Sequence, residues 1–113
     1  MTQEEGNKLI MFFDGAENLE IEVSGKATPA IKYKESFYPE WNLPRFNSDW
    51  NLLMPVVDDI KYGRRFSCVV WNEISHPSYR LYKAIEKGLL NLSLSQTHEA
   101  VVKFIQWYNT TKK

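Results

Sequence analysis

The chain has 113 residues with 14 acidic and 14 basic side chains, so its formal net charge is zero. Hydrophobic residues make up 43% and charged residues 25%, which is the composition of a globular protein and argues against disorder. The length fits one domain, residues 1–113, and the longest apolar runs, 9–13 and 52–57, are much shorter than the roughly 20 residues that cross a bilayer. The chain also starts with acidic and polar residues, unlike a secretory signal, and this predicts a cytoplasmic protein.

The first predicted element is a helix over residues 3–13. Thr2 and Glu5 have the spacing of a capping box, in which each side chain accepts a hydrogen bond from the other residue's backbone N–H. Gly15 follows at a position where a left-handed residue commonly ends a helix. We expect the apolar residues of this helix to face the core: Leu9, Ile10, Phe12 and Phe13.

Two strands are expected after this helix. The segment Asn-Leu-Glu-Ile-Glu-Val (18–23) alternates apolar and charged residues, which is typical of a half-buried strand. After a turn in residues 24–29, the segment Ala-Ile-Lys-Tyr-Lys (30–34) is the second expected strand.

The segment 35–47 contains two prolines and four aromatic residues, and it is expected to be an irregular loop. Such a loop either packs over the core as a lid or presents a binding surface. Its aromatic residues are therefore the candidates for contact with a partner protein: Phe37, Tyr38, Trp41 and Phe46.

A second helix is predicted from Ser48, its expected cap, to Gly63, with Asp49 placed favourably for the helix dipole. Pro55 interrupts this helix, because proline lacks a backbone donor and crowds the carbonyl of Asn51, which costs about 3 kcal/mol in a regular helix. The helix should therefore kink at Pro55 or begin its regular part there.

The next predicted elements are a strand over 65–71, rich in β-branched and aromatic residues, and a helix over 77–87. Ser75 is the expected cap of that helix, Pro77 fits its first turn, and Gly88 is its expected terminator. A pair of strands is the competing interpretation of the helical segment.

The segment 89–96 alternates leucine with asparagine or serine, which predicts a strand with one face in water. Thr97 is the expected cap of a last helix with a buried stripe of five residues: Ala100, Val101, Phe104, Ile105 and Tyr108. The mixture of elements predicts an α/β (α+β) layered sandwich, in which a small mixed or antiparallel sheet is packed by about three to four helices.

No catalytic or metal-binding pattern stands out in the sequence. Cys68 lies in an apolar run, where a buried, inert thiol is expected, and Glu73 with His76 is an acid–base pair of a kind that arises by chance. The possible metal ligands do not have ligand spacing: Asp58, Asp59, His76 and His98. We therefore expect no enzyme activity, no cofactor and no metal site.

Basic and aromatic residues alternate in the segments 61–66 and 79–83. Cations that contact phosphates and rings that stack on bases are the features of single-stranded nucleic-acid binding, provided that the two segments adjoin in space. The alternative is that the tyrosines face the core while the charges are solvated. The candidate nucleic-acid residues are Lys61, Tyr62, Arg64, Arg65, Tyr79, Arg80 and Lys83.

A role in protein interaction is the principal expectation. The chain is rich in tyrosine, tryptophan and arginine, the residue types enriched at binding hot spots, and it has no catalytic pattern. Residues 1–56 carry more acidic than basic side chains, and residues 57–113 carry more basic than acidic ones. These opposite charges would allow the protein to associate with itself as a homo-oligomer.

Three segments, taken together, resemble a known family. "MTQEEGNKLIMFF", "DWNLLMPVVDDI" and "AVVKFIQWYN" resemble, in the same order, a family of small uncharacterised proteins of phages and prophages of Bacteroides-type bacteria. The resemblance implies a small phage-type α/β sandwich, with Pro55 as part of its scaffold, and an accessory protein of the bacterial host cell that binds a host or phage protein. The region 64–96 shows no such resemblance.

Overall fold

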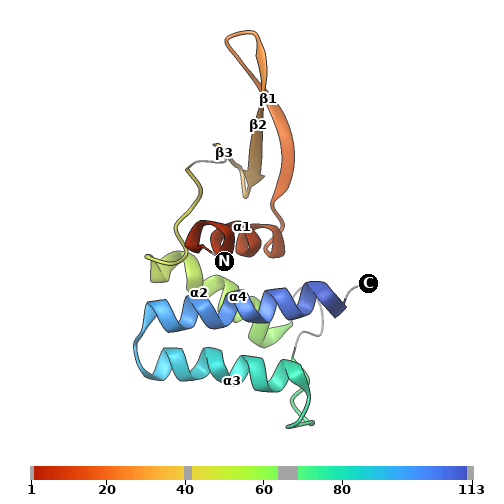
Figure 1. Cartoon of the computed structure of the whole chain (residues 1–113), viewed down its shortest axis with the longest axis vertical. Coiled ribbons are helices and arrows are strands. Elements are labelled where there is room, and N and C mark those ends of the chain that lie inside the picture. The colour runs from red at the N-terminus through yellow and green to blue at the C-terminus, as the bar shows by residue number, and fades with distance from the viewer. Residues whose placement is uncertain (1, 40–41, 64–68, 112–113) are drawn as a thin grey trace.

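A computed structural model describes residues 2–39, 42–63 and 69–111. Figure 1 shows a group of helices from which a β-hairpin extends. The described residues form an α+β domain with a three-stranded antiparallel sheet and four helices, so the predicted fold class is confirmed. In chain order the elements are α1 (Gln3–Phe13), β1 (Glu17–Val23), β2 (Lys26–Tyr33), β3 (Ser36–Pro39), α2 (Trp50–Tyr62), α3 (Pro77–Leu90) and α4 (Leu94–Thr111).

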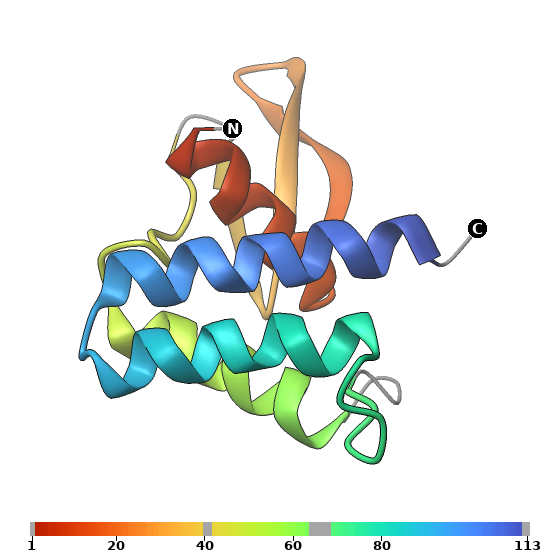
Figure 2. The same cartoon turned by 60° about the horizontal axis from the view of Figure 1, so that its bottom comes forward.

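The helices α3 and α4 run side by side and are joined by a tight turn, while α1 and α2 also pack against α4 (Figure 2). The predicted capping box of α1 is present, because the Thr2 hydroxyl accepts from the Glu5 N–H at 3.1 Å and the Glu5 carboxylate faces the Thr2 N–H. Four of the five residues predicted for the buried stripe of α4 are fully or almost fully buried: Ala100, Val101, Phe104 and Ile105. The core lies between these helices.

Glycines bring α4 close to its neighbours. Gly88 is not the terminator of α3, as predicted, but lies within it, where an added Cβ atom would stand only 2.6 Å from Thr97 Oγ1 and 2.8 Å from the Thr97 backbone nitrogen. Gly6 lets α1 approach α4 closely, because a Cβ atom at this position would stand 2.9 Å from Val102 Cγ2. Side chains at either position would hold the helices apart.

The sheet has the order β1-β2-β3 and two short turns. Ser24 and Gly25 connect β1 to β2 with positive φ angles of 52° and 79°, the geometry of a type I′ hairpin turn. The prediction for residues 36–39 is corrected, because they form β3 and not part of an irregular loop. β3 pairs with the second half of β2, where Tyr33 lies opposite Ser36, and this hairpin pairing overrides the loop signal of the prolines and aromatic residues.

A buried hydrogen bond joins the base of the hairpin to α1. The Tyr33 hydroxyl donates to the carboxylate of Asp14, which follows the last residue of α1. Burial and the adjacent carboxylate both raise the pKa of Tyr33, so its hydroxyl keeps its proton. The hairpin is thereby fixed at its base, whereas its far end extends beyond the helices (Figure 1).

The helix α2 begins one residue later than expected. Asp49, and not Ser48, is its cap, because the Asp49 carboxylate accepts from the Asn51 N–H at 2.9 Å. Pro55 lies inside α2, which continues to Tyr62, and both Pro55 and Asn51 lie on the exposed side of the helix. The carbonyl that loses its partner to proline is therefore on the side that water reaches.

The prediction of a strand over residues 89–96 is wrong. α3 continues to Leu90, and α4 begins at Leu94. Between them, Leu92 has a left-handed φ of 52°, and the Ser93 hydroxyl accepts from the Gln96 N–H at 3.2 Å, as a helix cap does.

Two further predictions near this region are affected. Thr97, the predicted cap of the last helix, lies inside α4, and its hydroxyl donates to the Ser93 carbonyl at 2.8 Å. Most of the strand predicted over 65–71 lies outside the described residues, and its described part, 69–71, is not a strand.

No helix among the described residues is long and apolar enough to cross a membrane.

Candidate functional site

Large apolar side chains remain exposed where α2 ends and α3 begins. Tyr62, Trp71 and Ile74 keep 62%, 45% and 74% of their surface exposed. We call these residues, together with Tyr79 and Tyr82, the aromatic end. Scattered exposed apolar residues are normal on proteins, but a group of them marks a candidate contact surface.

Tyr82 is the buried centre of the aromatic end. Trp71 packs edge-to-face on Tyr82, with ring centroids 5.2 Å apart, and on Tyr79, with centroids 6.0 Å apart. Burial raises the pKa of Tyr82 to about 12, and the negative charges of Glu86 and Asp58 add to this effect. Tyr82 is therefore neutral at physiological pH, and it lies close to both Trp71 and Tyr62.

Polar contacts at the start of α3 hold the loop that carries Trp71. His76 and not Ser75 is the cap of α3, because His76 Nδ1 accepts from the Ser78 N–H at 3.2 Å. The buried Ser78 hydroxyl lies 2.8 Å from His76 Nδ1 and accepts from the Val70 N–H, also at 2.8 Å. The His76 ring packs edge-to-face on Trp107 of α4. The loop is thus attached to two helices.

The described candidates for nucleic-acid binding lie on two helices, and two of them, Tyr62 and Tyr79, belong to the aromatic end. Lys61 and Tyr62 end α2, while Tyr79, Arg80 and Lys83 lie on α3. Lys83 lies over the Tyr79 ring at 5.3 Å, and the carboxylate of Glu86, 3.4 Å away, raises the pKa of Lys83. Arg64 and Arg65 lie outside the described residues.

The three described aromatic residues of the 35–47 segment differ in burial and do not form one exposed surface. Phe37 is 56% exposed, and Tyr38 is partly buried against the core. Phe46 is completely buried, with its ring edge-to-face on Tyr33, so its choice as an interaction residue is corrected: it belongs to the core. Trp41 lies outside the described residues.

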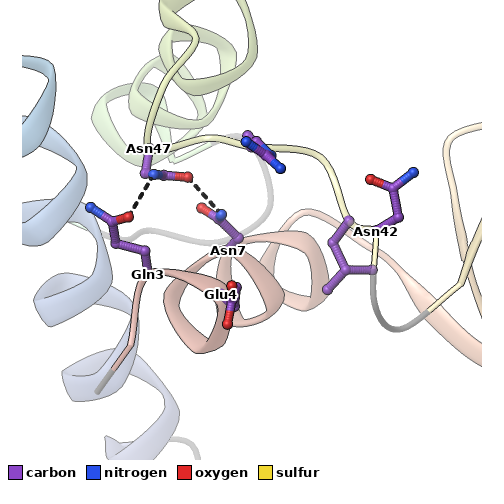
Figure 3. A pocket seen from close by; sticks show the side chains of 7 residues that line it. Gln3, Glu4, Asn7, Asn42 and Asn47 are labelled. Carbon is purple, nitrogen blue, oxygen red and sulfur yellow. Dashed lines mark hydrogen bonds between the residues drawn. The ribbon is translucent and has the colours of Figure 1, made fainter.

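A small polar pocket lies between the start of α1 and the segment before α2 (Figure 3). It has a volume of about 190 Å³ and is lined by Gln3, Glu4, Asn7, Asn42, Leu43, Arg45 and Asn47. The sequence analysis did not identify this pocket, because its amides come from segments about 40 residues apart, and the only local signal was the spacing of Gln3 and Asn7 on one side of a helix.

A chain of hydrogen bonds runs from this pocket into the core. Asn47 donates to Gln3 Oε1 at 3.0 Å, and Asn7 donates to Asn47 Oδ1 at 2.8 Å (Figure 3). His98 Nε2, in α4, lies 2.8 Å from Asn7 Oδ1 and must be the donor, because Asn7 Oδ1 is an acceptor. The amides are therefore occupied with one another, and they connect α1, α4 and the segment before α2.

The stability of the protein is expected to fall as the pH is lowered below about 6.5, because of His98. Burial lowers the pKa of His98 below its ordinary value, against an opposing effect of Glu99, so the unfolded chain binds the proton more readily than the folded one. The stability that the neutral ring provides is present above the unfolded pKa and is lost as pH falls toward the folded pKa, by up to about 1.4 kcal/mol per pH unit.

Urea unfolding at a series of pH values measures this effect. His98→Gln is the matched variant, since its amide nitrogen can still donate to Asn7 but does not titrate, and it should show a flatter pH dependence. Equal slopes for the two proteins between about pH 7 and pH 5 would contradict the assignment to His98.

Within the described residues, no group of three or more histidine, cysteine, aspartate or glutamate side chains is arranged to hold a metal ion. Comparisons with protein-family models, with curated proteins and with solved structures find no match to this chain.

Proposed function

We propose that the protein is a non-enzymatic interaction module that binds a partner protein through the aromatic end. The observation that carries this proposal is that Trp71 packs on the buried ring of Tyr82 yet stays 45% exposed, while Ile74, three residues further along the same loop, and Tyr62 at the end of α2 are also exposed. Tyrosine and tryptophan dominate binding hot spots because they bury a large area with few rotatable bonds.

The surroundings of the aromatic end support this role. Trp71 is held by two tyrosine rings and the loop behind it is hydrogen-bonded to α3, so binding would require little ordering of this side chain. Charged residues of both signs, Lys83 and Glu86, lie beside Tyr79 and Tyr82 as the rim of an interface does. The resemblance of the sequence favours a phage or prophage accessory protein, whose partner would be a host or phage protein.

Substituting Ile74 by aspartate should abolish capture of the partner without unfolding the protein, because a charge replaces an apolar side chain at the contact surface. The measurement is a tagged pull-down from bacterial lysate, treated with nuclease and analysed by mass spectrometry. Leu92→Asp is the matched control, since Leu92 is 85% exposed in the α3–α4 turn and takes no part in the aromatic end. Equal capture by both variants would refute the proposal.

A second candidate is single-stranded nucleic-acid binding by the same region. The observations that favour it are that Lys83 lies over the ring of Tyr79 on α3 and that Tyr62, at the end of α2, is near enough to Tyr82 of α3 to act on its pKa. Titration of a labelled single-stranded oligonucleotide at rising salt tests it, because phosphate contacts weaken steeply with ionic strength. Binding that disappears with nuclease in the pull-down, and is lost in Arg80→Ala, would favour this function over the first.

A further inference from the structure

The outer edge of β1 is open. β1 is the terminal strand in the order β1-β2-β3, and no strand in the described part of the chain pairs with its other side. The hairpin extends away from the helices, which therefore do not cover this edge near the turn (Figure 1). An open edge of seven residues is a template for pairing with another extended chain.

The register shows which backbone groups point outward. A two-residue turn closes on a hydrogen-bonded pair, here Val23 and Lys26, and such pairs alternate with pairs that do not bond each other. The residues whose N–H and C=O point away from β2 are therefore Asn18, Glu20 and Glu22. Pro29 lies opposite Glu20, at a position where β1 requires no N–H from β2, which agrees with this assignment.

The charged side chains of β1 are all acidic. Three of the seven residues of β1 are glutamates, and none is basic. Natural edge strands commonly carry charged side chains that discourage unselective pairing, and in β1 these charged side chains are all glutamates. Because Glu20 and Glu22 also present their backbone groups outward, a strand that pairs here meets carboxylates beside every free hydrogen-bonding position near the turn.

The negative charge of the β1 edge determines which kind of strand can pair with it. In an antiparallel pair of two β1 strands centred on Glu20, the two Glu20 side chains would face each other, and like charges directly opposite are destabilising. A strand with basic residues at alternate positions would instead place a cation opposite each carboxylate. Its intervening residues would lie beside Leu19 and Ile21, which favours apolar or β-branched types.

We propose that the outer edge of β1 binds, by strand addition, an extended segment of a partner protein in which lysine or arginine alternates with apolar residues. Backbone hydrogen bonds to Asn18, Glu20 and Glu22 supply the pairing, and the glutamates supply the selectivity. This surface is separate from the aromatic end, so the inference does not depend on the function proposed above.

The probe for this test is a fluorescein-labelled peptide of alternating lysine and valine, kept dilute while the full-length protein is titrated. Binding should weaken about tenfold in Glu20→Lys, because an attractive cross-strand pair becomes repulsive. Glu73→Lys is the matched control, an exposed glutamate outside the sheet, and its affinity should be unchanged. A peptide of alternating glutamate and valine should not bind.

Amide hydrogen exchange then separates strand addition from simple charge attraction. Bound peptide should slow exchange at Asn18, Glu20 and Glu22, while Leu19 and Ile21, already bonded to β2, should change little. The proposal is overturned if the peptide does not bind, if it binds without this alternating protection, or if the protein alone sediments as a dimer with the same amides protected.

Discussion

Replacing Phe46 by alanine is expected to lower the free energy of unfolding by about 3–5 kcal/mol. The Phe46 side chain is completely buried, and its ring packs edge-to-face on Tyr33 with centroids 6.0 Å apart. It also belongs to the hydrophobic core cluster, so the cavity would open within the core, beside Tyr33 of β2. A cavity of this size closes only partly, because the surrounding core is already packed.

Phe37→Ala is the matched control, since Phe37 belongs to the same aromatic segment but is 56% exposed. Its stability change should stay within about 0.5 kcal/mol, as for most surface substitutions. Urea unfolding of both variants, followed by circular dichroism, compares the two phenylalanines directly. Similar losses in both variants would contradict the division of this segment into a buried and an exposed part.

The sequence predicted those elements whose signals are local. The capping box of Thr2 and Glu5 located the start of α1, and the alternation in residues 18–23 located β1. The buried stripe of α4 was read correctly because a helix repeats its buried face every three to four residues. Each of these signals is contained within one helix or one strand, so no knowledge of distant residues was needed.

The errors fell where contacts outside a segment outweigh the pattern within it. In 89–96 the leucines alternate as in a strand, but Ser93 caps α4 and Gly88 lets α4 approach α3, and together these favour two helices joined by a turn. β3 is a strand because β2 supplies its hydrogen bonds, and nothing within residues 36–39 signals this. The spacing of Ser93 and Gln96 was a local signal of a helix cap, whereas the Gly88–Thr97 contact and the pairing of β3 depend on residues outside each segment.

The candidate sites were predictable in composition but not in exposure. The aromatic surplus was evident in the sequence, yet only the fold distinguishes the buried Phe46 from the exposed Trp71 and Ile74. The chain of hydrogen bonds from Gln3 to His98 was not predicted, because its members come from three separate segments. Burial and side-chain partnership are properties of packing, and residue types alone do not fix them.

Replacing Gly88 by alanine is expected to destabilise the protein by about 1–3 kcal/mol, although alanine favours helices. The new methyl group would stand 2.6 Å from Thr97 Oγ1, 2.8 Å from the Thr97 backbone nitrogen and 3.0 Å from its Cα atom. The hydroxyl can rotate away, but the backbone of α4 can move only by separating from α3, which would disturb the packing of Ile85 and Val101 in the core.

Helix propensity alone predicts the opposite sign, a gain of about 1 kcal/mol for alanine over glycine inside a helix. Ala84→Gly measures that propensity at an exposed position of the same helix and should lose about this amount. Thermal unfolding of the two variants therefore separates packing from propensity at Gly88. If Gly88→Ala is as stable as the parent protein or more stable, α3 and α4 are not in the close contact that defines this end of the fold.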